Sequence, residues 1–370
     1  MRFTVERENI YNALNAVSKA TAQRGIQPVL SNVLIDTIGG DKIKLSATDL
    51  DLYIEADITA EIKEAGSITL PAKKLTEIIT RLPEKSIDFT LNTENNLMKI
   101  ICGKTKFDLI GISASEFPKT VVPESDESIE IKISELLKAV KETSYSSATY
   151  DTSNVLSGVY FEVGKNYLEM AATDGNRLSR TTKKLENTTG KEYTIVVPTR
   201  TLVEFTRILT GTQDETVKVV IKNSQISFKL EERILVSRLL EGHYPKYKQL
   251  IPTSCEKTVL ANRELLTQAL ERTSTMVNER TSIVKFLFEN LHLYLSADTP
   301  DLGDSSDVIE VEYEGDELNI AFNYKYILDA IKVIDTERVK IELNGSLSPA
   351  ILKPDSEEDY LCLVMPVQIR

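Results

Sequence analysis

The chain has 370 residues, 41% of them hydrophobic and 27% charged, so it is long enough for two or three globular domains. Its formal net charge of −12 argues against nucleic-acid binding through overall charge, and no apolar run is long enough to span a bilayer. The sequence opens without the apolar stretch of a signal peptide, and Cys102, Cys255 and Cys362 form no CxxC pair. We therefore expect a cytoplasmic protein with reduced thiols.

Three parts of the chain begin alike, with an apolar strand followed by an amphipathic helix. These helices are predicted at 7–21, 134–143 and 262–273. An alternating strand follows in each part, at 43–49, 168–174 and 293–299, and the first residues of these strands are 125 positions apart both times. Alternation with a period of two is typical of half-buried antiparallel strands. The sequence therefore predicts one α+β domain repeated three times.

Asp49 and Asp174 close the first two of these strands. A catalytic carboxylate is one interpretation of such a residue. The other is a turn aspartate that accepts hydrogen bonds from the backbone just after it. We favour the turn, because the residue recurs together with the architecture of the repeat.

A second helix in each repeat carries basic residues on one face. The windows 72–82, 199–209 and 323–334 start at or just after Pro71, Pro198 and Asn323, which are residues suited to helix starts. At 100° per residue, the apolar side chains fall on one face and the basic ones on the opposite face. One charged surface helix is common, but three copies indicate a surface that faces a polyanion.

The distribution of charge supports this interpretation. The six helix windows together carry a net charge of +5, so the rest of the chain carries −17. A basic lining within an acidic shell fits a protein that holds DNA in one place and repels it elsewhere.

Proline pairs mark the ends of the first two repeats. Phe117-Pro118 is followed by Pro123, and Tyr244-Pro245 is followed by Pro252. We therefore expect three domains, at 1–123, 124–252 and 253–370.

Motifs for catalysis are absent from the sequence. The only histidines, His243 and His292, have no metal-ligand spacing, and the chain has no GxSxG elbow and no phosphate-binding loop. We expect no catalytic residue, no metal and no cofactor. Two alternatives stay open: a DNA-processing enzyme on a basic repeat scaffold, and an interaction scaffold whose cations are simply solvated.

Several motifs in order resemble one known family. The three repeats, ATDGNRL at 172–178, the two aromatic-proline pairs and the ending MPVQIR are similar to the bacterial DNA polymerase III beta subunit, the DNA sliding clamp, along the whole chain. The resemblance implies a head-to-tail homodimeric ring around duplex DNA, with two inner helices and outer antiparallel sheets in each domain. It also implies that the replicative polymerase, the clamp loader and repair proteins bind through short linear peptides between the second and third domains.

The family's sites transfer to this chain residue by residue. DNA contacts are expected from Arg24, Lys73, Lys74, Arg81, Arg200, Arg207, Lys325 and Lys332. The partner-peptide pocket is expected at Leu156, Thr173, Gly175, Asn176, Arg177, Leu178, Pro245, Leu250, Asn323, Tyr326, Leu363, Val364, Met365 and Pro366. The dimer interface is expected at Phe107, Leu109 and Met276.

Several positions depart from the pattern common in that family, and they bear on the pocket's preference: Asn154-Val155, Asn176, Gln249 and Val367. Ordinary core packing is the alternative for Leu178, Leu250 and Met365, and also for Phe107 and Leu109.

Overall fold

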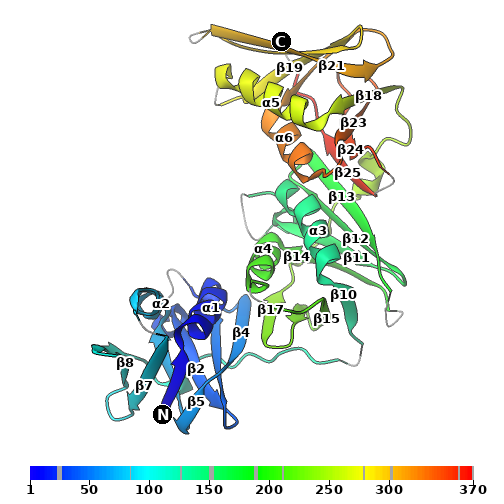
Figure 1. The fold of residues 1–370 in the computed structure, drawn as a ribbon. Coiled ribbons are helices and arrows are strands. Elements are labelled where there is room, and N and C mark those ends of the chain that lie inside the picture. The colour runs from blue at the N-terminus through cyan, green and yellow to red at the C-terminus, as the bar shows by residue number, and fades with distance from the viewer. Residues whose placement is uncertain are drawn as a thin grey trace. The chain divides into compact units, whose positions relative to one another are not determined.

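The structure is a computed structural model that describes residues 1–22, 27–83, 85–125, 127–149, 154–186, 191–210, 212–277, 280–300, 303–356 and 359–368. Its contacts divide the chain into two compact units. Unit 1 consists of Met1–Ser134, Glu186–Lys191 and Arg200–Leu239, and unit 2 of Glu135–Leu185, Glu192–Thr199 and Leu240–Arg370. The second sequence repeat is therefore shared between the units, each of which is described by itself below (Figure 1).

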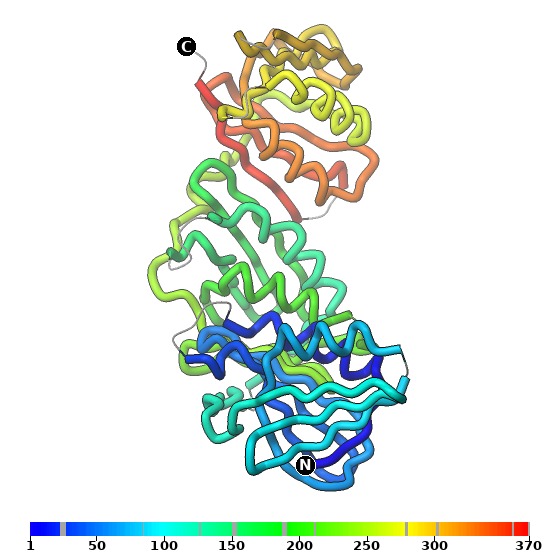
Figure 2. Tube along the Cα trace, turned by 90° about the vertical axis from the view of Figure 1, so that its left-hand side faces the viewer, coloured from blue at the N-terminus to red at the C-terminus, as the bar shows by residue number. Residues whose placement is uncertain are grey.

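The described residues form six α-helices, and all six were predicted. They are α1 (Arg7–Val17), α2 (Ala72–Arg81), α3 (Ile133–Thr143), α4 (Thr199–Ile208), α5 (Arg263–Thr273) and α6 (Tyr324–Val333). Asn323 starts α6 as expected, because its side chain accepts a hydrogen bond from the Lys325 N–H at 3.0 Å. Within unit 1, α1 lies beside α2, and within unit 2, α5 lies beside α6 (Figure 2).

Unit 1 contains two antiparallel sheets. The five-stranded sheet has the order β5 (Glu61–Glu64), β1 (Arg2–Glu6), β7 (Ser86–Asn92), β8 (Leu97–Cys102), β9 (Thr105–Ile110). The eight-stranded sheet has the order β10 (Ile129–Lys132), β15 (Thr216–Lys222), β16 (Gln225–Lys229), β17 (Arg233–Arg238), β4 (Leu52–Thr59), β3 (Lys42–Thr48), β2 (Asn32–Ile38), β6 (Ser67–Pro71). Pairing of β17 with β4 joins strands of the first and second repeats in one sheet.

Unit 2 contains one twelve-stranded antiparallel sheet. Its order is β14 (Tyr193–Pro198), β11 (Gly158–Val163), β12 (Tyr167–Thr173), β13 (Arg177–Lys184), β25 (Tyr360–Val364), β24 (Ala350–Pro354), β23 (Arg338–Leu343), β18 (Lys257–Asn262), β21 (Gly303–Tyr313), β20 (His292–Thr299), β19 (Ile283–Glu289), β22 (Leu318–Asn323). Pairing of β13 with β25 sets Leu178 opposite Leu363 and so joins the second repeat to the third.

The three alternating strands were predicted correctly, but half-burial is wrong for β12 and for the second half of β3, where residues 45–48 are all buried. In β20, buried residues alternate with more exposed ones, whereas every residue of β12 after Tyr167 is buried. The second face of β12 is covered because Tyr247, from the short helix η6 (Tyr247–Leu250), packs in a buried cluster with Ala171 and Leu178. A strand pattern does not reveal such a cover, which comes from a segment far away in sequence.

The turn interpretation of the two aspartates is confirmed. Asp49 Oδ1 accepts hydrogen bonds from the N–H groups of Asp51 and Leu52, at 3.2 and 2.9 Å. Asp174 Oδ1 accepts from the N–H groups of Asn176 and Arg177, at 2.9 and 3.1 Å. Each carboxylate therefore closes the turn after its strand.

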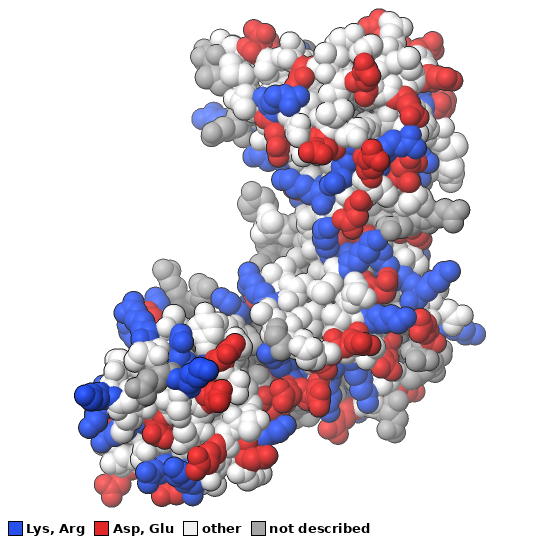
Figure 3. Space-filling view, in the orientation of Figure 1, with Lys and Arg blue, Asp and Glu red and all other residues white. Residues whose placement is uncertain are grey.

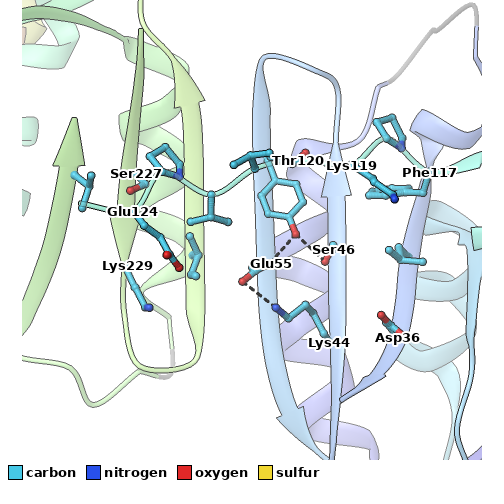
Figure 4. Close-up of a pocket in the computed structure, with 18 of the residues that line it drawn as sticks. Asp36, Lys44, Ser46, Glu55, Phe117, Lys119, Thr120, Glu124, Ser227 and Lys229 are labelled. Atoms are coloured by element: carbon cyan, nitrogen blue, oxygen red, sulfur yellow. Dashed lines mark hydrogen bonds and ion pairs between the residues drawn. The ribbon is translucent and has the colours of Figure 1, made fainter. Parts of the chain in front are cut away.

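A groove of about 1430 Å³ lies over the eight-stranded sheet of unit 1, beneath the segment 114–125 (Figure 4). The Tyr53 hydroxyl donates to Glu55 at 2.6 Å, and the Lys44 ammonium lies 3.2 Å from the same carboxylate. Glu55 is thus engaged by two neighbours. The described lining of the groove includes no histidine or cysteine.

Candidate DNA-facing and peptide-binding sites

Helix α2 carries the first set of predicted DNA contacts. Leu75 and Ile79 are fully buried in unit 1, while Lys73, Lys74 and Arg81 are exposed. Lys74 pairs with Glu77 at 2.8 Å, and its hydrogen bond lowers the pKa of the Glu77 carboxyl. Lys73 and Arg81 form no ion pair with any described residue and are therefore the more available cations of this helix.

Helix α4 buries Leu202 and Phe205 on one face, and Arg200 and Arg207 are exposed to solvent. Both cations line a groove of about 650 Å³ that also holds Asp49. Arg200 lies 2.5 Å from Asp49 and donates to the Lys19 carbonyl at 3.0 Å.

Arg207 likewise lies 2.6 Å from Glu204. The cations of α4 are thus held in position by carboxylates, and a phosphate has to compete with those carboxylates for them.

Helix α6 repeats the pattern in unit 2. Ile327 and Ile331 are buried, and Lys325 and Lys332 are exposed without an ion pair among the described residues. Asp329 lies between the two lysines on the same stripe of the helix.

The three basic helix faces that were predicted are therefore present, but neighbouring carboxylates neutralise part of their positive charge. Figure 3 shows basic and acidic side chains interspersed over the visible face of each unit. Arg24, the remaining predicted DNA contact, lies outside the described residues.

The residues predicted for the peptide pocket all belong to unit 2. Most of them lie on the turn before β13, on η6, at the start of α6, or on and just after β25. Several are joined directly: Leu178 is paired with Leu363, and the Met365 N–H donates to the Asn176 carbonyl at 2.8 Å. Leu156 lies on the short helix η5 (Val155–Ser157) and is half-buried.

Exposure separates the pocket interpretation from ordinary core packing. Leu178 is buried at 1% exposure, as either interpretation allows. Leu250 and Met365, however, are 58% and 42% exposed, which contradicts core packing for these two side chains. Large apolar residues left exposed beside a buried apolar cluster are typical of a binding surface.

Arg177, which the family resemblance places in the peptide pocket, directs its side chain inward instead of toward the surface. Its guanidinium donates to Asp174 at 3.0 Å, to Asp329 at 2.7 Å and to the Tyr145 carbonyl at 2.6 Å, and its side chain is 10% exposed. It also stacks over the Tyr326 ring at 4.5 Å. Burial lowers the pKa of Arg177, but Asp329 and Asp174 outweigh it and raise the pKa above its ordinary value. Arg177 thus ties the turn before β13 to α6.

Two tyrosines attach η6 and the residues just before it to β12, and neither bond was predicted from the sequence. The Tyr244 hydroxyl accepts from the Thr173 N–H at 3.1 Å, and the Tyr247 hydroxyl donates to Glu169. Tyr160 completes an aromatic cluster with both, with ring centroids 5.3 and 5.4 Å away. These contacts fix the segment that carries Leu250.

The predicted dimer residues lie at the boundary between core and surface. Phe107 and Leu109 are half-buried in β9, which is an edge strand of its sheet, and Ile110 beside them is 71% exposed. Met276 is half-buried on the short helix η7 (Ser274–Met276) after α5.

The part of the chain that the structure describes contains no group of three His, Cys, Asp or Glu residues placed to hold a metal ion. None of its helices is long and apolar enough to cross a membrane.

The chain matches one protein family along its length. Models of the N-terminal, central and C-terminal domains of the DNA polymerase III beta subunit match residues 1–121, 130–246 and 248–368. The beta sliding clamp of Synechococcus elongatus is 33% identical, with all of both chains covered.

Solved structures of sliding clamps are similar to the chain over its whole length. The DNA polymerase sliding clamp of Bacillus subtilis superimposes with a TM-score of 0.94 at 29% identity, and a Pseudomonas aeruginosa sliding clamp bound to griselimycin with 0.94 at 30%. Each alignment covers all of both chains.

A chain in which one α+β domain is repeated three times, with a basic second helix in each repeat, has the architecture of a DNA sliding clamp. It is a non-catalytic processivity factor rather than an enzyme. More particularly, the chain belongs to the DNA polymerase III beta subunit family.

Proposed function

We propose that two copies of the chain close head to tail into a ring around duplex DNA, and that α2, α4 and α6 line the hole. The observation that carries this proposal is the repeated placement of exposed cations opposite a buried helix face, in both units. A helix across the grooves meets phosphates rather than base edges, so the attraction carries no sequence information. That allows sliding, because no base sequence forms a deep energy well.

The cations proposed to contact phosphates are Arg24, Lys73, Lys74, Arg81, Arg200, Arg207, Lys325 and Lys332.

Two open strand edges support the head-to-tail contact. One is β9, with Phe107 and Leu109. The other is β21, which pairs with β18 only through residues 311–313 and leaves one side of the rest unpaired among the described strands. The contact joins two different surfaces, so it must close into a ring to avoid open filaments.

The same proposal includes the peptide-binding site, the domain boundaries and the location in the cell. Short linear peptides of the polymerase, the clamp loader and repair proteins bind where Leu250 and Met365 are exposed beside the buried Leu178 and Leu363. The domain boundaries lie near Pro123 and Pro252, and the protein works in the cytoplasm.

The test is the length of DNA made by DNA polymerase III on a primed single-stranded circle. Addition of the chain and a clamp loader should lengthen the products, and an excess of a Gln-Leu-x-Leu-Phe peptide should shorten them again. Products of unchanged length would refute tethering. Lengthening that the peptide does not reverse would refute the peptide site alone.

A further inference from the structure

Glu169 is a buried carboxylate beneath the proposed peptide site. It lies on β12, is 4% exposed, and follows none of the patterns by which the sequence predicts a functional residue. A carboxylate this buried is stable only if hydrogen bonds or cations satisfy it.

Three donors from two segments satisfy this carboxylate. On one oxygen, Tyr247 Oη donates a hydrogen bond, and Lys248 Nζ lies 2.8 Å away. On the other oxygen, Arg180 Nε donates at 2.8 Å. Tyr247 and Lys248 belong to η6, and Arg180 belongs to β13.

Arg180 extends the connection to a third segment. Its two terminal nitrogens donate to Asp359, at 3.0 and 3.2 Å, and Asp359 directly precedes β25. One carboxylate on β12 therefore links η6, β13 and the start of β25. These are the segments that carry Leu250, Leu178 and Leu363.

Helix η6 depends on such bonds for its position. It has four residues, too few for a helix to be stable by itself, and it leaves Leu250 58% exposed. Without its anchors, the segment gains backbone freedom, and a peptide that binds against Leu250 has to restrict that freedom again.

The charge of Glu169 matters as well as its shape. Burial raises the pKa of Glu169, but the bonds from Lys248, Tyr247 and Arg180 outweigh it and lower the pKa below its ordinary value. Glu169 is therefore ionised at neutral pH, and its bonds to the two cations are charge-assisted. A glutamine of the same size keeps an acceptor for Tyr247 but loses the charge.

We propose that Glu169 is a positioning residue of the peptide site, one that sets the spacing of its apolar walls without touching the peptide. This inference rests on the proposed peptide site. The inference adds that part of the peptide affinity depends on Glu169, which is buried beneath the site.

The test compares two buried carboxylates of unit 2 in the full-length protein. Glu142, 1% exposed, lies 2.8 Å from Lys183 and accepts from Thr181 at 2.6 Å, but contacts no residue of η6 in the structure. Binding of a fluorescent Gln-Leu-x-Leu-Phe peptide is measured by anisotropy for wild type, Glu169→Gln and Glu142→Gln, together with each melting temperature. We expect about a tenfold rise in Kd for Glu169→Gln and less than a twofold rise for Glu142→Gln, although both substitutions lower the melting temperature.

A double-mutant cycle gives a second readout that a loss of general stability would not change. Tyr247→Phe removes only the hydroxyl that donates to Glu169. For this cycle Glu169 is changed to Met, which fills a similar space but offers Tyr247 no acceptor oxygen. The Kd of Glu169→Met/Tyr247→Phe should therefore lie within twofold of the weaker single variant.

Each other outcome decides against the proposal. Wild-type affinity in Glu169→Gln, equal losses in both glutamine variants, or additive effects in the cycle would overturn the role of Glu169 and leave the peptide site standing. Absence of peptide binding to the wild type would overturn the peptide site, and this inference with it.

Discussion

Neutralising the unpaired cations of the helices proposed to face DNA should flatten the salt dependence of DNA binding. Lys73, Arg81, Lys325 and Lys332 are exposed and form no ion pair among the described residues, so they are the groups freest to replace counterions on phosphates. Each phosphate contact contributes about 0.9 to the slope of log K against log salt concentration. Changing all four residues to Gln should therefore reduce the slope by roughly 3 to 4 per chain.

The assay is equilibrium binding of a fluorescent primed duplex between about 20 and 150 mM KCl, the range over which the electrostatic term changes strongly. The matched control changes four exposed lysines away from these helices, and so removes the same net charge: Lys119, Lys184, Lys218 and Lys229. We expect the control to keep nearly the wild-type slope. Equal slopes in the two quadruple variants would refute the assignment of the helices to DNA, because net charge alone would then explain the binding.

Three further predictions concern the proposed dimer edge, a half-buried carboxylate and the C-terminal segment. Leu109→Asp should convert the dimer to monomers in sedimentation, and a variant that stays dimeric would place the interface elsewhere. Burial raises the pKa of Asp57, and its Oδ1 has no hydrogen-bond partner among the described residues. Stability from a raised carboxyl pKa is lost as pH increases, so Asp57→Asn should be more stable than wild type at pH 7, by about 1 kcal/mol. The gain should vanish below the ordinary pKa of 3.8, and a gain that persists at lower pH would contradict the cause. Deletion of 365–370 should abolish peptide binding while the dimer remains, and full peptide affinity in the deleted dimer would refute the site.

Local signals in the sequence were enough to predict the helices and turns. The basic windows became α2, α4 and α6 because apolar residues at helical spacing, such as Leu75 and Ile79, require one buried face. Asp174 closes a turn through bonds to residues two and three positions on, so its role follows from its own neighbourhood.

Contacts between distant residues could not be predicted in the same way. Arg177 binds Asp329, 152 positions away, and Arg200 binds Asp49, 151 positions away. Nothing near either arginine indicates its partner. The burial of the second face of β12 could not be predicted for the same reason, because Tyr247 and Glu169 are 78 positions apart in the sequence. The residues proposed for the peptide pocket thus followed from family resemblance, whereas the ion pairs that connect their segments could be found only in the structure.

Enclosure of duplex DNA is the central claim, and topology tests it directly. The chain is loaded by a clamp loader onto a nicked circular plasmid, the complex is isolated by gel filtration, and half of it is cut once with a restriction enzyme. We expect the protein to stay on the intact circle and to leave the linear DNA through its ends. Equal retention on the circular and linear DNA would show that the protein holds DNA by surface contact, and would contradict the ring.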